Sequence, residues 1–167
     1  MNKYIYSIAA LLVLAGVVWL IVTPGKHGKY DQFVQYQTKT SREVALTCTT
    51  DMATKFHIHP VLKILIDGIE QKIPTNTGIT NFCMNSIHTH DDGGTLHIES
   101  PVQKDFTIGD FFAVWGKEFN RNQILDYKID NAHAITVTIN GNEVQTYENT
   151  LMKDKDDIII EYKSLKK

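Results

Sequence analysis

The chain has 167 residues, of which 43% are apolar and 22% charged, with 10 Gly and 4 Pro. This composition excludes a disordered chain and a fibrous protein, and the length predicts one compact domain with an appendage. Seventeen basic against nineteen acidic side chains give a formal charge of −2 without a basic block. We therefore expect no nucleic-acid partner, because phosphate binding needs a clustered positive surface. Two cysteines also exclude a disulfide-dense scaffold and a four-cysteine zinc site.

An uncharged apolar run, IYSIAALLVLAGVVWLIV, occupies residues 5–22 and is followed by Pro24 and Gly25. About 20 such residues in a helix span a hydrocarbon core about 30 Å thick. The run is longer than a usual signal-peptide core, and no small-residue cleavage site follows Trp19. The sequence thus predicts an uncleaved transmembrane signal anchor over residues 1–25, with a buried soluble helix as the alternative.

Residues 26–43 are polar with scattered aromatics and predict a membrane-proximal linker or short helix, followed by a domain over residues 44–167. Lysines flank both ends of the anchor, so the positive-inside rule does not decide its orientation. Short N-terminal anchors usually export the domain behind them, and we expect a single-pass membrane protein with an extracytoplasmic domain. Export would let Cys48 and Cys83 form a disulfide; the alternatives are two buried free thiols or soft metal ligands.

The first half of the domain reads as strands. Alternating and β-branched residues predict strands at residues 44–49, 56–66 and 69–73 and a hairpin at residues 86–100. Pro60 makes the second strand an edge or bulged strand. Asp67-Gly68 and the Asp-Asp-Gly-Gly run at residues 91–94 supply the hairpin turns.

One short helix is expected next, from Ile108 to Trp115, capped by Thr107 and ended by Gly116. A type I′ hairpin then joins residues 134–139 to 143–146, and a last strand covers residues 158–162. This order predicts an α+β fold, with one helix packed on a mainly antiparallel or mixed sheet. The C-terminal part resembles the ending of small β-grasp domains.

Histidines form the strongest chemical pattern. His57 and His59 are two apart in a predicted strand, so they leave the same face about 6.5 to 7 Å apart, and His88 and His90 repeat this spacing. If the second hairpin turns at residues 92–93, His88 stands opposite His97, His90 opposite Thr95 and Ser86 opposite Glu99. His88, His90, His97 and Glu99 then share one face. The two other histidines, at positions 27 and 133, are expected to be solvated.

Converging imidazoles repel when protonated and need partners when neutral, and a bound cation satisfies both demands. Imidazole suits zinc and copper, so the sequence predicts one or two copper or zinc ions held by the histidines at positions 57, 59, 88, 90 and 97. Asp91 and Glu99 are candidates for orienting these rings, and Glu99 also for ligation or general-base chemistry. A structural or pH-sensing histidine cluster is the alternative.

An ordered series of motifs carries a resemblance. The chain reads HIHPVL at residues 57–62, Cys83-Met84, HTHD at 88–91, HIESP at 97–101 and DFTIGDFF at 105–112, followed by Trp115-Gly116. It is similar, over residues 52–162, to a group of small membrane-anchored or exported bacterial and archaeal proteins that carry these motifs in this order. The resemblance implies a shared histidine-centred site and no particular reaction.

The leading hypothesis is therefore a membrane-anchored extracytoplasmic domain that captures copper or zinc. A metal-dependent hydrolase or oxidase of the cell envelope is a second hypothesis, although the sequence has no HExxH, GxSxG or phosphate-binding loop. A third is a module that binds another envelope protein without metal.

Overall fold

The computed structural model describes residues 34–50 and 54–165. The described residues from Tyr36 onward belong to the second of two units into which the chain divides. The predicted transmembrane anchor at residues 1–25 lies outside the described residues, as does the predicted linker up to residue 33. Among the described residues, no helix has both the length and the apolar character that a membrane crossing requires.

The second unit is an α+β fold in which strands predominate, as expected. Its ordered elements are α3 (Ser41–Leu46), β1 (Cys48–Thr49), β2 (Phe56–Ile58), β3 (Val61–Ile66), β4 (Ile69–Gln71), β5 (Met84–Asn85), β6 (Ile87–His88), β7 (His97–Ser100), α4 (Ile108–Trp115), β8 (Phe119–Asn120), β9 (Gln123–Ile124), β10 (Tyr127–Lys128), β11 (His133–Ile139), β12 (Asn142–Val144), the 3-10 helix η1 (Tyr147–Asn149) and β13 (Asp157–Ser164).

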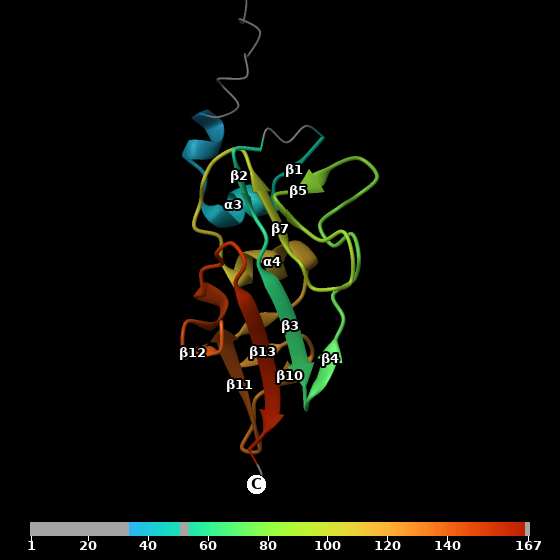
Figure 1. Ribbon diagram of the computed structural model, residues 1–167, viewed down its shortest axis with the longest axis vertical. Helices are drawn as coiled ribbons and strands as arrows, with labels where there is room; N and C mark the ends of the chain where they lie inside the picture. The colour runs from blue at the N-terminus through green and yellow to red at the C-terminus, as the bar shows by residue number, and fades with distance from the viewer. Residues whose placement is uncertain (1–33, 51–53, 166–167) are drawn as a thin grey trace, which may run out of the picture. The chain divides into compact units, whose positions relative to one another are not determined.

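The largest sheet has five strands in the order β12-β11-β13-β3-β4. Strand β13 runs parallel to β3, and all other pairs in this sheet are antiparallel. The predicted type I′ turn is confirmed, because Asn140 and Gly141 both have positive φ angles, 52° and 79°. The three longest strands of this sheet, β11, β13 and β3, lie side by side in Figure 1.

A second sheet of three strands, in the order β2-β7-β6, carries His57, His97 and His88. The segment just before its central strand β7 is joined to the start of β3 by a bridge between Thr95 and Val61 and by a hydrogen bond from the Leu62 N–H to the Gly94 carbonyl (2.9 Å). Gly94 has a φ of +84°, and an added Cβ would lie only 2.3 Å from the Leu62 carbonyl oxygen. Glycine is therefore required where the two sheets meet.

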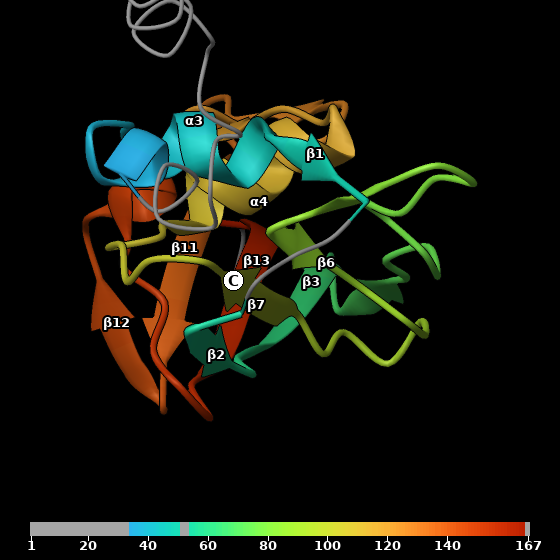
Figure 2. The same cartoon turned by 90° about the horizontal axis from the view of Figure 1, so that it is seen from above.

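Helix α4 follows the sequence prediction in both bounds and caps. Thr107 forms a capping box with Asp110, and Gly116 ends the helix with a φ of 69°. Phe111 and Phe112 are buried in the core. Helices α3 and α4 lie together on one side of the strands (Figure 2). They are joined by an ion pair between the Arg42 Nε and the almost fully buried Asp110 carboxylate (2.6 Å).

Two strand predictions are only partly correct. Residues 44–46 belong to helix α3, because Thr40 and Glu43 form a capping box that starts a helix at Ser41. The predicted strand at residues 56–66 is two strands in different sheets, β2 and β3, separated at His59 and Pro60. The small sheet β10-β9-β8 was not foreseen.

The two cysteines form a disulfide between β1 and β5, closing a separation of 35 residues. Cys48 pairs with Asn85 in the same two-stranded ladder. The disulfide excludes the alternatives of free thiols and of thiolate ligands to a metal.

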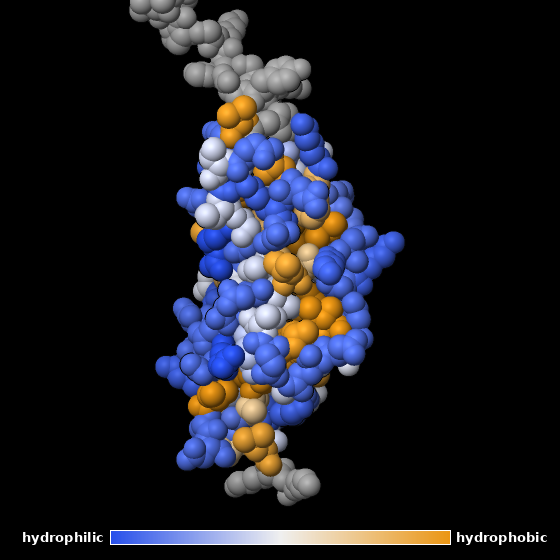
Figure 3. Space-filling view, turned by 90° about the vertical axis from the view of Figure 1, so that its left-hand side faces the viewer, coloured by the Kyte–Doolittle hydropathy of each residue, from blue (hydrophilic) through white to orange (hydrophobic). Residues whose placement is uncertain are grey.

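One face of the molecule, seen in Figure 3, is mainly hydrophilic with separate apolar patches.

Candidate metal centre

The three-stranded sheet places the chemically active side chains on one of its faces. Strand β7 is central, with His97 directly opposite His88 of β6, and Glu99 directly opposite His57 of β2. Residues directly opposite one another in antiparallel strands project from the same face. The predicted register of the second hairpin is thus confirmed at His88 and His97.

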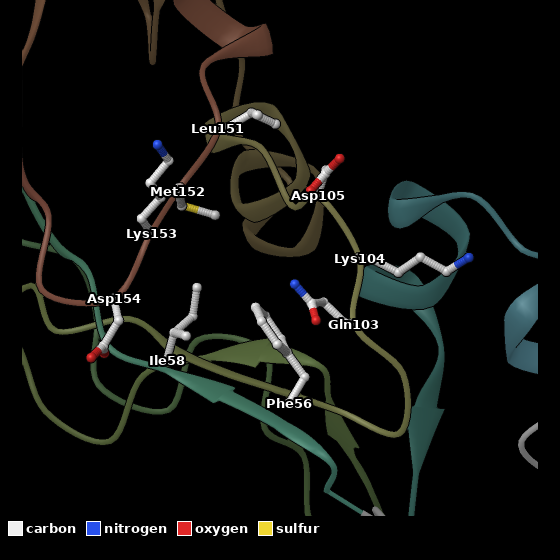
Figure 4. Close-up of a pocket in the computed structure, with 9 residues that line it drawn as sticks. All are labelled: Phe56, Ile58, Gln103, Lys104, Asp105, Leu151, Met152, Lys153 and Asp154. Carbon is white, nitrogen blue, oxygen red and sulfur yellow. The ribbon is translucent and has the colours of Figure 1, made fainter.

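The opposite face of the same sheet belongs to the core. Ile87 and Ile98, which alternate with the histidines, have no exposed surface. Phe56 and Ile58 of β2 point into a cavity of about 240 Å³, which Met152 and the loop around residues 103–105 also line (Figure 4). This cavity lies behind the strand, and none of the histidines lines it. The histidines and this cavity therefore lie on opposite faces of β2.

Five imidazoles meet on the histidine face, and they form two groups of three that share His97. One group is His57, His59 and His97, and the other is His88, His90 and His97; within each, one ligand atom per residue lies within 4.8 Å of the others. The ring centroid of His97 lies 4.7 Å from that of His59 and 4.5 Å from that of His90. All five histidines that the sequence predicts as metal ligands are brought together.

His90 reaches this position differently from the prediction. The β6–β7 ladder ends at His88, so His90 and Thr95 do not form the expected strand pair. The backbone of this segment is instead held by a neighbouring loop: the Thr75 hydroxyl donates to the His90 carbonyl (2.7 Å), and the Thr89 N–H donates to the Thr77 carbonyl (3.0 Å). The loop thereby fixes the direction in which the His90 side chain leaves the backbone.

His88 is the deepest ring and has no exposed surface. Its Nδ1 lies 3.0 Å from the Asn85 carbonyl oxygen, to which only a protonated nitrogen can donate. In the neutral ring, the lone pair then belongs to Nε2, which is buried and has no hydrogen-bond partner among the described residues. Metal-binding histidines show this arrangement, in which one nitrogen is oriented by a carbonyl and the other faces the ion.

Burial and mutual repulsion favour the neutral form of two of these rings. Desolvation lowers the pKa of His88 below its usual value, and the nearby rings of His90 and His97 lower it further, whereas the Asn85 carbonyl and Glu99 oppose the shift. Desolvation also lowers the pKa of His97, with additional repulsion from His90 and His59. The neutral form that these effects favour is the form that binds metals.

The group of His57, His59 and His97 is the more accessible of the two, and carboxylates lie against two of its residues. His57 Nε2 lies 3.1 Å from a Glu99 carboxylate oxygen. The backbone N–H of His59 donates to the Asp154 carboxylate (3.0 Å), which lies 4.0 Å from the ring nitrogen Nδ1. Of the roles that the sequence allowed for Glu99, the contact with His57 favours orientation of that ring.

Asp91 serves the hairpin turn, where its carboxylate accepts a hydrogen bond from the Gly93 N–H (2.8 Å). His133 is not simply solvated as expected: its Nδ1 lies 2.9 Å from Asp130, and its ring stacks on Tyr162. It stands at the start of β11 in the five-stranded sheet, and the described histidine groups do not include it. His27 lies outside the described residues.

Sequence reasoning missed the supporting residues. Asn85 orients His88 through its backbone carbonyl, which no side-chain pattern reveals. Asp154 is 95 positions from His59 in the chain. Gly78 has a φ of +79°, and an added Cβ would lie 2.5 Å from the Ile87 carbonyl oxygen and 3.2 Å from the His88 Cβ. The positive φ and this close approach explain the glycine beside His88.

No family model matches this chain, and no curated protein or solved structure was found to match it.

Proposed function

We propose that this protein binds a transition metal ion, copper or zinc, through His88, His90 and His97. The observation that carries the proposal is the buried Nε2 of His88, which lacks a hydrogen-bond partner among the described residues while Nδ1 is fixed by the Asn85 carbonyl. Leaving a buried polar atom unpaired costs about 1 to 3 kcal/mol. A metal ion held between the three rings would satisfy this atom.

The chemistry of the donors supports copper or zinc. Three neutral imidazoles suit both ions, and each metal–nitrogen bond to zinc is about 2.0 to 2.1 Å long. The ligand atoms of this group already lie within 4.8 Å of one another, so small ring rotations are enough to close around one ion. Three protein ligands would leave a position for water or an exogenous ligand.

The proposal includes the compartment and the anchor. We place the domain outside the cytoplasm, tethered by the apolar segment at residues 5–22 and facing other proteins of the envelope as potential partners. The disulfide between Cys48 and Cys83 supports this location, because structural disulfides persist mainly in oxidising compartments. We also propose that membrane-anchored proteins carrying the same series of histidine motifs share this site.

The proposal also covers the fold of the five-stranded sheet, which we assign as β-grasp-like. Hairpin β3–β4 precedes helix α4, hairpin β11–β12 follows it, and the last strand β13 lies parallel beside β3. This arrangement supports the β-grasp prediction for the C-terminal part.

The test is a metal measurement on the full-length protein. Metal-free protein is equilibrated separately with Cu(II) and Zn(II) in the presence of excess glycine to suppress weak binding, and bound metal is quantified by elemental analysis. We expect stoichiometric metal in the wild type and in the control His133→Ala, which removes an imidazole from the other sheet. His88→Ala combined with His90→Ala should lose an ion. Equal metal content in this double variant, or none in the wild type, would overturn the proposal.

A further inference from the structure

His97 occupies a special place on the histidine face. It lies on the central strand of the three-stranded sheet, between β2, which leads to His59, and β6, which carries His88. Its ring contacts both histidine pairs, with centroid distances of 4.7 Å to His59 and 5.6 Å to His88. It is the one residue common to both groups of potential ligands among the described residues.

The five imidazoles do not form a single group whose ligand atoms all lie within 4.8 Å of one another. With metal–nitrogen bonds of about 2 Å, two ligand atoms on the same ion lie no more than about 4 Å apart. Strands β2 and β6 are separated by β7, which puts their backbones about 10 Å apart. In the described part of the chain, ring contacts join His57 to His59, His88 to His90, and each pair to His97, but never one pair to the other.

We propose that the histidine face holds two metal ions, one on each side of His97, and that the His97 ring bridges them. This inference rests on the proposed function and adds a second ion bound by His57 and His59. An imidazole has two ring nitrogens, so it can bind one ion through each of them once its N–H proton has been released to solvent. The ring then carries one negative charge as an imidazolate, and no electron is transferred.

The surroundings of His57 suit a second cation. Glu99 brings a carboxylate to within 3.1 Å of His57 Nε2, and its side chain is only 20% exposed. With its proton on Nε2, His57 donates a hydrogen bond to this carboxylate and keeps the lone pair of Nδ1 for the ion. The charges of Glu99 and of an imidazolate at His97 would both reduce the repulsion between two ions. The ion bound by His57 and His59 would be accessible from solvent, because these two side chains are 46% and 41% exposed.

The experiment counts Cu(II) ions and measures their magnetic coupling in the full-length protein. Protein is equilibrated with Cu(II) in excess glycine, bound copper is determined by elemental analysis, and the electron paramagnetic resonance signal is integrated at low temperature. Two Cu(II) ions bridged by an imidazolate couple antiferromagnetically. We therefore expect two coppers per chain in the wild type, with an integrated signal well below the total copper.

Matched variants separate the two sites. His57→Ala with His59→Ala should retain one copper, as should His88→Ala with His90→Ala, and in both the integrated signal should equal the bound copper. His133→Ala should keep two coupled ions, and circular dichroism should show that each variant retains the wild-type strand content.

Each of the other outcomes would overturn a particular part of the proposals. One copper in the wild type that the His88→Ala and His90→Ala double variant abolishes would overturn the two-ion inference while leaving the proposed function intact. Two coppers with a full signal would overturn the bridging role of His97. The absence of bound copper and zinc would overturn the proposed function itself.

Discussion

Replacing His88 by Phe separates a metal ligand from a purely structural histidine. Phe has a planar ring of similar shape and no polar atoms, so it removes the unpaired Nε2 and also the hydrogen bond from Nδ1 to Asn85. Removal of the unpaired atom stabilises the metal-free fold by about 1 to 3 kcal/mol, and loss of the hydrogen bond costs about 1 kcal/mol. The net change in unfolding free energy of the metal-free protein should therefore lie between zero and about 2 kcal/mol in favour of the variant.

Metal should act differently on the two proteins. A free metal concentration about 100-fold above the dissociation constant stabilises a native protein by about 2.7 kcal/mol. For a chain of this size, about 1 kcal/mol corresponds to about 2 to 4 °C in the melting temperature. We expect Zn(II) to raise the melting temperature of the wild type by about 5 to 10 °C, and that of His88→Phe by much less.

The assay is thermal unfolding followed by circular dichroism, with and without buffered Zn(II), on the full-length protein. His133→Ala is the control and should show the full metal-dependent rise, even if its own melting temperature is lower. A full rise in His88→Phe would refute the ligand role of His88. A loss of more than about 3 kcal/mol in the metal-free variant would also refute it, because His88 would then have a structural role instead.

Three other changes test the supporting structure. Gly94→Ala introduces a Cβ 2.3 Å from a backbone carbonyl oxygen of β3, at a residue with a positive φ. We therefore expect the free energy of unfolding, measured with urea, to fall by at least about 3 kcal/mol, and the metal affinity to weaken. Wild-type values for both would contradict the assigned contact. Replacing Cys48 and Cys83 by Ala releases a 35-residue loop. This change should lower the free energy of unfolding by about 4 kcal/mol relative to the wild type, with both proteins measured in the absence of reductant. The pKa values of His88 and His97 are lowered by folding, so the metal-free native state binds fewer protons than the unfolded state. Its stability should be constant above about pH 6.5 and fall as the pH decreases toward the lowered pKa values, and urea midpoints that rise on acidification would show that the sign is wrong.

Local signals in the sequence are sufficient where neighbouring residues decide the structure. Helix α4 is predicted at both ends, because Thr107 and Gly116 act on the backbone within one turn. The hairpin register that sets His88 opposite His97 also depends only on a short turn. The start of α3 is equally local, since the Thr40–Glu43 capping box is a sequence motif, but the β-branched residues nearby favour a strand and conceal it.

Contacts between distant segments are beyond such reasoning. Nothing near Pro60 reveals that the chain leaves one sheet for another there, because the bonds that decide it are made to distant segments. The Pro60 carbonyl accepts from the Leu96 N–H, and the Val61 N–H donates to the Asp156 carbonyl. The pairing of β2 with β7, which brings His57 beside Glu99, joins strands that lie far apart in the chain. The same holds for the contact of Asp154 with His59.

The sequence by itself determined that four histidines lie in two H-x-H pairs and that His97 lies across a tight hairpin from His88, since strand alternation and turn chemistry are local properties. Only the tertiary structure decided that β7 lies between the two pairs, so that His97 belongs to both groups of ligands. It also decided that Nε2 of His88 is buried without a partner among the described residues. Burial and the order of strands in a sheet depend on which distant segments pack together, and pairing across long separations is not encoded in any single stretch of the chain.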